Sequence, residues 1–384
     1  MRILLSTPVF KPMVGGMETM ADNLARHFTA RGHQVTVVTP IAATEADGAP
    51  YAIVRQPSGR MFYRLVSNCD LVFSNGASLY AAPWVMLTGK PTVMRHTAYQ
   101  VSCIDGAGWY GGEPAPLSHW ASFGWHLRKG YWRQALRGIP KTLLLRFFAH
   151  HFVSANVAIS DWMRERHPLP NQIRIHNPFP IHKFVAAKNT NGQYAYDFFF
   201  LGRLISEKGI DVLLRAFARQ APHRRLCLIG DGPERSRLER LTAELGLTDR
   251  VTFCGTLRGP ALLEQIRVCR IAVLPSTWEE PFGGVATEIM AAGKNMIVSR
   301  NGALAEIVGP AGLTFTNGEF TQLASAMERL VGDESLQKVQ RAAGAERIKD
   351  FDEERLIDQY EQLFSRLLHH NQSTAGRSAA DPAT

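Results

Sequence analysis

The sequence predicts an α/β protein with two domains of similar size, each built on a parallel sheet. The chain has 384 residues, which is more than a single hydrophobic core usually serves. Short apolar runs of strand length alternate with segments of helical periodicity. This alternation stops at a polar, glycine-containing stretch between residues 178 and 195 and then begins again. We therefore expect one domain over residues 1–185 and a second over residues 186–350.

The first half opens as a β-α-β unit. Arg2–Ser6 is an apolar run of strand length, and apolar residues then recur at helical spacing from Met17 to Phe28. Gly32 is suited to end that helix before the strand Gln34–Thr39. Further strands of this half are expected at Leu71–Phe73, Thr92–Met94 and Asn156–Ile159.

The second half repeats the alternation of strands and helices. Its expected strands are Asp197–Leu201, Leu226–Ile229, Val251–Phe253, Ile271–Leu274, Met296–Val298 and Leu313–Phe315. A last helix over residues 351–369 carries an apolar stripe from Leu356 to Leu368, which has to be buried against a neighbouring surface. The tail over residues 370–384 lacks such periodicity, and we expect it to be disordered.

The composition is that of an ordinary globular protein, with 45% hydrophobic and 20% charged residues. No apolar run reaches the roughly 18 residues of a membrane span, and Met1–Pro8 is too short for a signal-peptide core. The five cysteines are odd in number and include no Cys-x-x-Cys pair, which disfavours a zinc site or a disulfide framework. We therefore expect a cytoplasmic protein with reduced thiols.

The positive charge is concentrated in one segment. The chain carries 43 basic and 34 acidic side chains, yet residues 115–160 contain no Asp or Glu. Within residues 115–150, basic side chains alternate with Trp, Phe and Leu. This composition suits a segment on an anionic membrane surface, and it equally suits a pair of core helices with a solvated basic face. Nucleic acid is not expected as a partner, because no recognition motif accompanies the charge.

Two cations follow a strand of the second half. Arg203 comes just after the strand that ends at Leu201, and Lys208 precedes a helix that starts at Ile210. Both fall in one loop at the carboxyl end of a strand, where open α/β sheets bind ligands. Arg offers a phosphate two donors and Lys adds a point charge, so together they could hold a diphosphate leaving group without a metal ion. A solvated loop is the alternative.

Glycine turns and carboxylates supply further candidates. Gly15-Gly16 and Phe282-Gly283-Gly284-Val285 each lead into a helix, whose first N–H groups suit an anion, although each could equally be a tight turn. Glu280 and Glu288 flank the second turn, at most about 12 Å apart along a helix. Carboxylates accept hydrogen bonds from vicinal hydroxyls, so this pair could hold two ends of a sugar nucleotide; the alternative is two surface carboxylates.

His96 is a candidate of a different kind. It ends the run Pro91–His96 at the carboxyl end of a strand, where a neutral imidazole could donate to a sugar hydroxyl or share a proton. An isolated His is more often structural. Asp105, Asp161 and His176 are lesser candidates on the same reasoning. A nicotinamide enzyme is not expected, because Arg235 stands where the third glycine of a dinucleotide fingerprint would fall.

In the order of its motifs the chain resembles the family-four retaining glycosyltransferases of GT-B fold, the glycosyl transferases of group 1. The matching segments are Gly15-Gly16 with Glu18, Gly202-Arg203 with Lys208-Gly209, Gly230–Glu234, Val251–Gly255, and Glu280 to Glu288. They span nearly the whole chain. Pro281 stands where many relatives have Gly, and Ser102–Ile139 has no counterpart that we can assign.

This resemblance implies two Rossmann-like domains with parallel sheets facing a central cleft, and a last helix that crosses back to the first domain. It implies a retaining, metal-independent transfer of a hexose from a nucleotide sugar, with UDP or GDP as the nucleotide and no cofactor. The acceptor would be a glycan or a lipid-linked acceptor, in cell-surface polysaccharide or glycolipid synthesis. Arg203 and Lys208 would bind the donor diphosphate, Glu280 the transferred sugar and Glu288 the ribose.

The resemblance also matches His96 to the family's histidine, and the first glycine pair to its loop near donor phosphate and acceptor. From the residues alone, two other functions stay open. One is glycoside hydrolysis by Glu280 and Glu288 as a carboxylate pair. The other is a non-catalytic scaffold that binds nucleotides or partner proteins.

Overall fold

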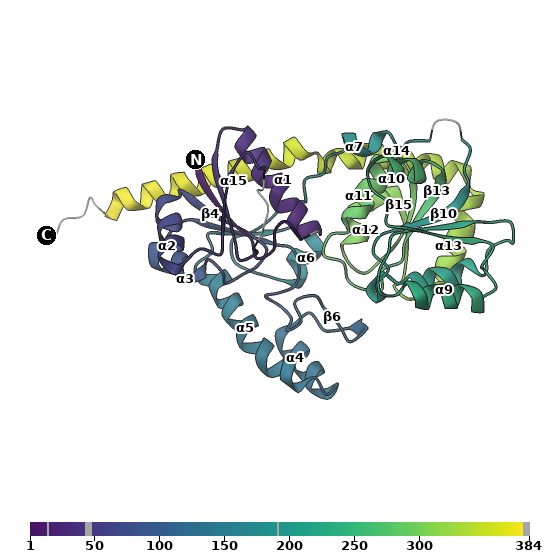
Figure 1. Ribbon diagram of the computed structural model, residues 1–384, viewed down its shortest axis with the longest axis horizontal. Helices are drawn as coiled ribbons and strands as arrows, with labels where there is room; N and C mark the ends of the chain where they lie inside the picture. Colours follow the sequence, from purple (N-terminus) through teal and green to yellow (C-terminus); the bar gives the residue numbers. More distant parts are fainter. Residues whose placement is uncertain (14, 43–47, 190–191, 379–384) are drawn as a thin grey trace. The chain divides into compact units, whose positions relative to one another are not determined.

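The structure is a computed structural model that describes residues 1–13, 15–42, 48–189 and 192–378. The chain divides into two compact units. Unit 1 comprises residues 1–108, residues 115–177 and the chain from residue 354 onwards, and unit 2 comprises residues 109–114 and 178–353. Each unit is an α/β structure with its own parallel sheet, as the sequence predicts (Figure 1).

Unit 1 is built on a seven-stranded sheet in the order β3-β2-β1-β4-β5-β8-β9, in which all neighbouring strands are parallel. The strands are β1 Arg2–Ser6, β2 Gln34–Thr39, β3 Ala52–Arg55, β4 Leu71–Asn75, β5 Thr92–His96, β8 Ala155–Ala158 and β9 Gln172–Arg174. The edge strands β3 and β9 were not expected. They are short and contain no buried residue, whereas every residue of the central strands β4 and β5 is buried.

Helices cover both faces of the sheet of unit 1 (Figure 1). The helices of unit 1 are α1 Gly16–Ala30, α2 Gly59–Asn68, α3 Ala82–Thr88, α4 His119–Arg128, α5 Trp132–His151, α6 Asp161–Arg166 and α15 Glu353–Ser378, and of these α4 packs on α5. On one face, α1 and α15 pack around Phe73, and the Phe28 and Phe364 rings lie 5.4 Å apart. On the other face, α2, α3 and α5 share one core cluster that includes Leu4 and Val72.

The helix α15 buries its apolar stripe in the core of unit 1, where Leu356, Tyr360 and Phe364 all lie. The expected disorder from residue 370 is wrong for the first part of the tail, because the helix continues through Ser378. Once the packed turns have formed, each added residue gains a backbone hydrogen bond, and the first proline of the tail is Pro382. Residues 379–384 lie outside the described part of the chain.

Unit 2 is built on a six-stranded parallel sheet in the order β12-β11-β10-β13-β14-β15. Its strands are β10 Tyr196–Leu201, β11 Leu226–Ile229, β12 Val251–Gly255, β13 Cys269–Leu274, β14 Asn295–Ser299 and β15 Gly312–Phe315. Its helices are α7 His182–Val185, η1 Ser206–Lys208, α8 Ile210–Phe217, α9 Arg235–Glu244, α10 Gly259–Arg267, α11 Gly284–Ala291, α12 Ala303–Val308, η2 Gly309–Ala311, α13 Phe320–Gly332, α14 Glu334–Arg347 and η3 Ile348–Phe351.

Unit 2 also includes an antiparallel hairpin, β6 Trp109–Tyr110 and β7 Glu113–Pro114, from the segment that matched no family motif. Unit 2 resumes at Pro178, before the boundary expected at residue 185, because the turn that precedes α7 already hydrogen-bonds to the unit: Phe179 N donates to Phe351 O at 2.9 Å. None of the helices in the described part of the chain has the length and hydropathy that crossing a bilayer requires.

Candidate functional site

The loop between β10 and α8 is tied to the segment that follows β13. The backbone N–H of Thr277 donates to the carbonyl of Glu207 at 3.0 Å. Gly209 ends the loop at φ 63°, and a Cβ placed on it would lie 2.2 Å from the carbonyl oxygen of Pro275. No side chain fits this approach, so the glycine allows the loop to close on the segment after β13.

Lys208 and Glu280 meet at this junction. The Lys208 ammonium lies 2.7 Å from Glu280 Oε1 and 5.8 Å from the centre of the Trp278 ring. Glu280 is only 7% exposed, and the Ser276 hydroxyl also donates to its carboxylate. The Lys208 ammonium and the Ser276 hydroxyl thus both serve a carboxylate oxygen of Glu280 that is shielded from water.

The backbone of Glu280 is held as firmly as its side chain. Its carbonyl accepts a hydrogen bond from the N–H of Ala303 at 2.8 Å. The segment that contains Gly302 and Ala303 approaches so closely that a Cβ on Gly302 would lie 2.7 Å from the backbone nitrogen of Glu280. The carboxylate is therefore presented from a rigid segment, which a binding residue requires.

Arg203 differs from Lys208 in that its side chain is exposed. No ion pair of Arg203 occurs among the described residues. The loop thus combines one cation that is already paired with a carboxylate and one that is free to meet an anion. This is the pair of cations that the sequence predicts at the end of β10.

The turn Phe282-Gly283-Gly284-Val285 leads directly into α11. Phe282 is buried against Phe351, with ring centres 6.0 Å apart, which anchors the turn. Gly283 has φ 83°, and a Cβ there would lie 2.3 Å from Leu304 Cδ2. Gly284 is exposed, with open space where its side chain would be, so a ligand has room beside the first turn of α11, whose first N–H groups have no partner within the helix.

Glu288 lies one turn further along α11 and is partly buried. Burial raises the pKa of its carboxyl to about 7, because the charged form loses solvation. The residue therefore changes its charge close to neutral pH. Of the residues predicted in the second half, the structure places Lys208 and Glu280 in contact, with Arg203 in the same loop and Glu288 on the helix after the turn.

The glycine pair of unit 1 stands at the start of α1. A Cβ on Gly15 would lie 2.5 Å from Glu18 Oε2, whereas Gly16 has open space on its side-chain position. Glu18 itself is 9% exposed. The first turn of α1 thus has room for a ligand beside Gly16, as expected for a turn that opens a helix.

His96 lies at the end of β5 as expected, but its ring is fully buried. Asn156 donates its amide hydrogens to the carbonyls of Ala149 and Pro170, so its side-chain oxygen accepts from His96 Nε2 at 2.9 Å. His96 Nδ1 therefore accepts from His167 Nε2 at 3.0 Å. His167 Nδ1 in turn accepts from the Ser102 hydroxyl at 2.9 Å.

This chain of hydrogen bonds engages both ring nitrogens of His96 inside the core, so the arrangement does not favour the catalytic role, which stays a prediction. Burial lowers the pKa of His96 to about 4 and that of His167 well below its usual value, so both rings are neutral. The lesser candidates also have structural partners. Asp105 accepts from the Ala107 N–H at 2.8 Å, Asp161 pairs with Arg174 at 3.2 Å, and His176 Nδ1 donates to the Ile159 carbonyl at 3.0 Å.

Two family models match successive parts of the chain. The model described as Glycosyltransferase Family 4 matches residues 14–175, and the model described as Glycosyl transferases group 1 matches residues 183–347. The first match covers residues of unit 1 apart from the hairpin segment 109–114, and the second lies within residues 178–353 of unit 2. The chain belongs to the group 1 glycosyltransferases.

Named relatives of this group 1 chain match parts of it. It is similar to the lipopolysaccharide core biosynthesis glycosyltransferase LpsD of Rhizobium meliloti, with 35% identity over 170 residues, which is 43% of this chain and 48% of LpsD. It is also similar to the D-inositol 3-phosphate glycosyltransferase of Stackebrandtia nassauensis, with 37% identity over 160 residues, 38% of this chain and 36% of the relative. The chain thus spans less than half the length of these relatives.

Solved structures resemble the group 1 chain over almost its whole length. HepE of Anabaena in complex with UDP has a TM-score of 0.74 at 21% identity, covering 95% of this chain and 100% of HepE. WaaG, a glycosyltransferase involved in lipopolysaccharide biosynthesis, has a TM-score of 0.66 at 15% identity, covering 94% of this chain and 99% of WaaG. At these identities the likeness concerns the fold, and it confirms the predicted GT-B fold class.

Sequence reasoning missed two side chains of the candidate site. Ser276 and Trp278 stand directly after β13 and contact the Lys208–Glu280 pair. The available signal was their position in Pro275–Glu280, where a hydroxyl residue comes four positions before a carboxylate at a strand end. That pattern alone does not show which side chain points toward Lys208.

A second feature of the group 1 chain is the outer surface of α2, α3, α4 and α5, which we call the α2–α5 face. Eleven of the fifteen large hydrophobic side chains exposed in the described residues belong to these four helices, including Trp132 at 53% and Phe147 at 51%. The four helices contain no Asp or Glu, while Arg128, Arg133 and Arg137 are exposed on them. The opposite side of α5 packs into the core through Leu145 and Phe148.

Proposed function

We propose that this chain is a retaining, metal-independent hexosyltransferase that uses a nucleotide sugar as donor and needs no cofactor. Its acceptor is a glycan or a lipid-linked molecule, in the synthesis of a cell-surface polysaccharide or glycolipid. The observation that carries the proposal is the Lys208–Glu280 pair at the carboxyl edge of the sheet, beside the exposed Arg203. The names of its relatives, which include a lipopolysaccharide core glycosyltransferase, support it.

In this proposal the charged groups of unit 2 hold the donor. Arg203 and Lys208 bind the diphosphate, and the first N–H groups of α11 at Gly284 and Val285 donate to it. Glu280 accepts hydrogen bonds from hydroxyls of the transferred hexose. Glu288 accepts from the ribose hydroxyls, and UDP or GDP is the nucleotide.

The transfer proceeds on one face of the sugar. The bond between the anomeric carbon and the diphosphate oxygen breaks while the acceptor hydroxyl oxygen bonds to the same face of that carbon. The departing phosphate oxygen takes the proton of the acceptor hydroxyl, so no protein base is needed. Arg203 and Lys208 stabilise the negative charge that builds on the diphosphate in the transition state. This stabilisation lowers the barrier to transfer.

Thermal protection by UDP-, GDP- and ADP-sugars identifies the donor, and the proposal expects one of the first two to raise the unfolding temperature. With that donor, nucleotide release should depend on an acceptor and survive a chelator, and the product should keep the anomeric configuration. Glycan cleavage without any nucleotide sugar would instead indicate a hydrolase. Donor protection without sugar release to any acceptor would indicate a binding scaffold.

We also propose that the α2–α5 face binds an anionic membrane surface, on the cytoplasmic side, where a lipid-linked acceptor would be met. Its exposed Trp and Leu side chains suit the lipid interface and its uncompensated Arg and Lys side chains suit acidic headgroups. Vesicle flotation tests this. The variant R133Q/R137Q should weaken binding to acidic vesicles, and the unit 2 variant R329Q/K338Q should not; equal flotation of the two would contradict the proposal.

A further inference from the structure

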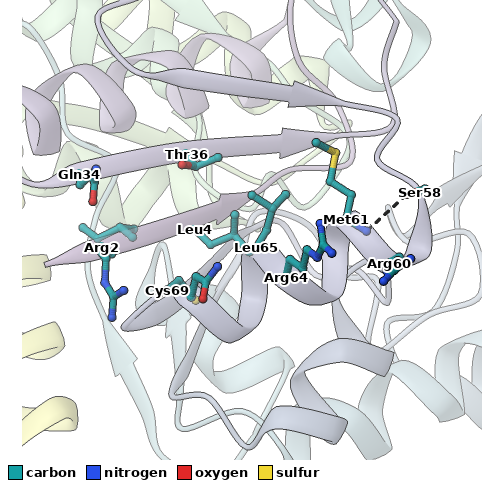
Figure 2. A pocket seen from close by; sticks show the side chains of 12 residues that line it. Arg2, Leu4, Gln34, Thr36, Ser58, Arg60, Met61, Arg64, Leu65 and Cys69 are labelled. Carbon is teal, nitrogen blue, oxygen red and sulfur yellow. Dashed lines mark hydrogen bonds between the residues drawn. The ribbon is translucent and has the colours of Figure 1, made fainter.

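A cavity of about 660 Å³ lies in unit 1, between α2 and the first two strands (Figure 2). Its lining comprises Arg2, Ile3, Leu4, Gln34, Thr36, Ser58, Arg60, Met61, Arg64, Leu65, Asn68 and Cys69. The lining follows α2 from Arg60 to Asn68 and includes Arg2 and Gln34, the first residues of β1 and β2. The candidate residues Gly15, Gly16 and His96 are not part of this lining, so the cavity is a separate place in the fold.

Three arginines line the cavity, and for two of them the described part of the chain provides no counter-charge. Arg2 is bound to Asp70, with its Nη2 and Nε at 2.6 and 3.0 Å from the carboxylate. Arg60 and Arg64 are exposed, and neither has an ion pair among the described residues. They stand one helical turn apart on α2, where like charges repel each other. An anion between them would remove this repulsion.

The remaining polar lining suits hydroxyl groups. Gln34, Thr36 and Asn68 present amide and hydroxyl groups, which both donate and accept hydrogen bonds. Leu4 and Leu65 form an apolar part of the wall, which Figure 2 shows below Thr36. The volume lies within the range of about 300–1,000 Å³ that is typical of small-molecule sites.

The cavity borders the α2–α5 face. Met61 lines the cavity and is 49% exposed, and Tyr63 and Leu87 are further exposed apolar residues of α2 and α3. The helices α2, α3 and α5 share one core cluster, which places them on the same side of the sheet. A membrane that contacts the outer side of these helices would therefore bring its headgroups to the mouth of the cavity.

We propose that this cavity binds a phosphate that carries hydroxyl groups, as in the headgroup of a glycerol-based phospholipid. Arg60 and Arg64 hold the phosphate with charge-assisted hydrogen bonds, and Gln34, Thr36 and Asn68 bind its hydroxyls. The choice of a lipid as the source rests on the proposed membrane association. The site itself rests on the cavity and its unpaired cations, and it is independent of the transfer reaction.

The test compares two singly charged lipids in vesicles, phosphatidylglycerol and phosphatidylmethanol, which differ in the hydroxyls of the headgroup. Full-length protein is titrated with each, and separately with soluble glycerol 1-phosphate. The variants are R60Q/R64Q in the cavity, R133Q/R137Q on α5, and R329Q/K338Q in unit 2. All replaced side chains are exposed, so the fold is expected to be kept.

We expect wild-type protein to prefer phosphatidylglycerol, and R60Q/R64Q to lose about tenfold in affinity together with this preference. R133Q/R137Q should weaken binding to both lipids alike and keep the preference. Saturable binding of glycerol 1-phosphate that needs Arg60 and Arg64, without any vesicle preference, would assign the cavity to a soluble phosphorylated polyol.

Binding of R60Q/R64Q equal to wild type in all three titrations would overturn the proposal. So would a wild-type protein that binds neither glycerol 1-phosphate nor phosphatidylglycerol in preference to phosphatidylmethanol. Release of nucleotide from the donor in a soluble assay should be unchanged in R60Q/R64Q. If neither wild type nor any variant transferred sugar, that result would count against the glycosyltransferase proposal. The result on the cavity would be unaffected.

Discussion

The carboxyl edges of the two sheets carry polar residues in opposite states. In unit 2, Lys208 and Glu280 form an ion pair and Arg203 is exposed beside it. In unit 1, His96 also follows a strand, but it is buried and neutral between Asn156 and His167. Both places are of the kind where α/β sheets bind ligands. A polar residue at a strand end is therefore available to a ligand only where its partners leave it charged or exposed.

We expect the largest effect on turnover from replacing Lys208, at the carboxyl edge of the unit 2 sheet. Lys208→Ala should lower the rate of sugar transfer at least about a hundredfold, because a cation that meets the departing diphosphate is lost. The measurement is nucleotide release with the donor at saturation. Lys338→Ala, which removes an exposed lysine on α14, is the matched control and should keep wild-type turnover.

This substitution also leaves Glu280 as a buried carboxylate without its cation, so stability has to be separated from chemistry. The double variant K208A/E280Q removes the unpaired charge and should recover the unfolding temperature. Turnover should stay low in both variants. If K208A/E280Q regained wild-type turnover, Lys208 would serve only to neutralise Glu280.

At the carboxyl edge of the unit 1 sheet, His96 is expected to affect the free energy of unfolding. The pKa of His96 is about 4 in the fold and about 6.5 in an unfolded chain, so below pH 6.5 the unfolded state gains a proton that the folded state does not. The free energy of unfolding should therefore fall as the pH drops from 6.5 to 4, by about 3 kcal/mol for this residue. Urea unfolding at a series of pH values measures it.

His96→Gln provides the comparison. It should unfold more easily at neutral pH and show a shallower pH slope, with part of the slope left because His167 is buried in the same way. Its turnover per folded molecule should stay within about twofold of wild type, as for a residue that contacts no substrate. A hundredfold loss of turnover with an unchanged unfolding profile would return His96 to the catalytic residues.

These contrasts show what sequence patterns can and cannot provide. The succession along the chain of the parallel strands other than β3 and β9, and the loop with Arg203 and Lys208, were predictable, because apolar periodicity and strand ends are local features. The contact between Lys208 and Glu280 joins positions 72 residues apart, and the resemblance implied only that both residues bind the donor. The burial of His96 depends on Asn156 and His167, which the fold brings together, and nothing in the run Pro91–His96 reveals them. The edge strands β3 and β9 were missed because neither contains a buried residue.

A smaller effect should distinguish the loop of unit 2 from an ordinary turn. Gly209 and Gly246 have nearly the same backbone angle, φ 63° and 67°, but a Cβ would lie 2.2 Å from a backbone oxygen at Gly209 and in open space at Gly246. Gly246→Ala should cost about 1 kcal/mol of stability from the left-handed conformation alone. Gly209→Ala should cost about 2 kcal/mol more, because the loop has to move away from Pro275.

Urea unfolding of both variants measures the difference, and donor titration shows whether the loop has moved. Gly209→Ala should weaken donor binding and Gly246→Ala should leave it unchanged. Equal stabilities and equal donor affinities would mean that the loop tolerates displacement, and the tie between the loop and the segment after β13 would then have no role in placing Lys208.

The smallest expected effect is on donor affinity and concerns Glu288. This residue is intermediate between the charged residues of the unit 2 edge and the neutral His96, because it is partly buried and titrates near neutrality. With a pKa of about 7, roughly a tenth of its carboxyl is ionised at pH 6 and roughly nine tenths at pH 8. Since the carboxylate form accepts both ribose hydroxyls, donor affinity should rise up to about tenfold over that interval. Glu288→Gln should flatten the profile, whereas Glu264→Gln, which alters an exposed carboxylate on α10, should keep it. A profile that keeps its full slope in Glu288→Gln would show that another group controls donor binding, and it would remove Glu288 from the ribose site.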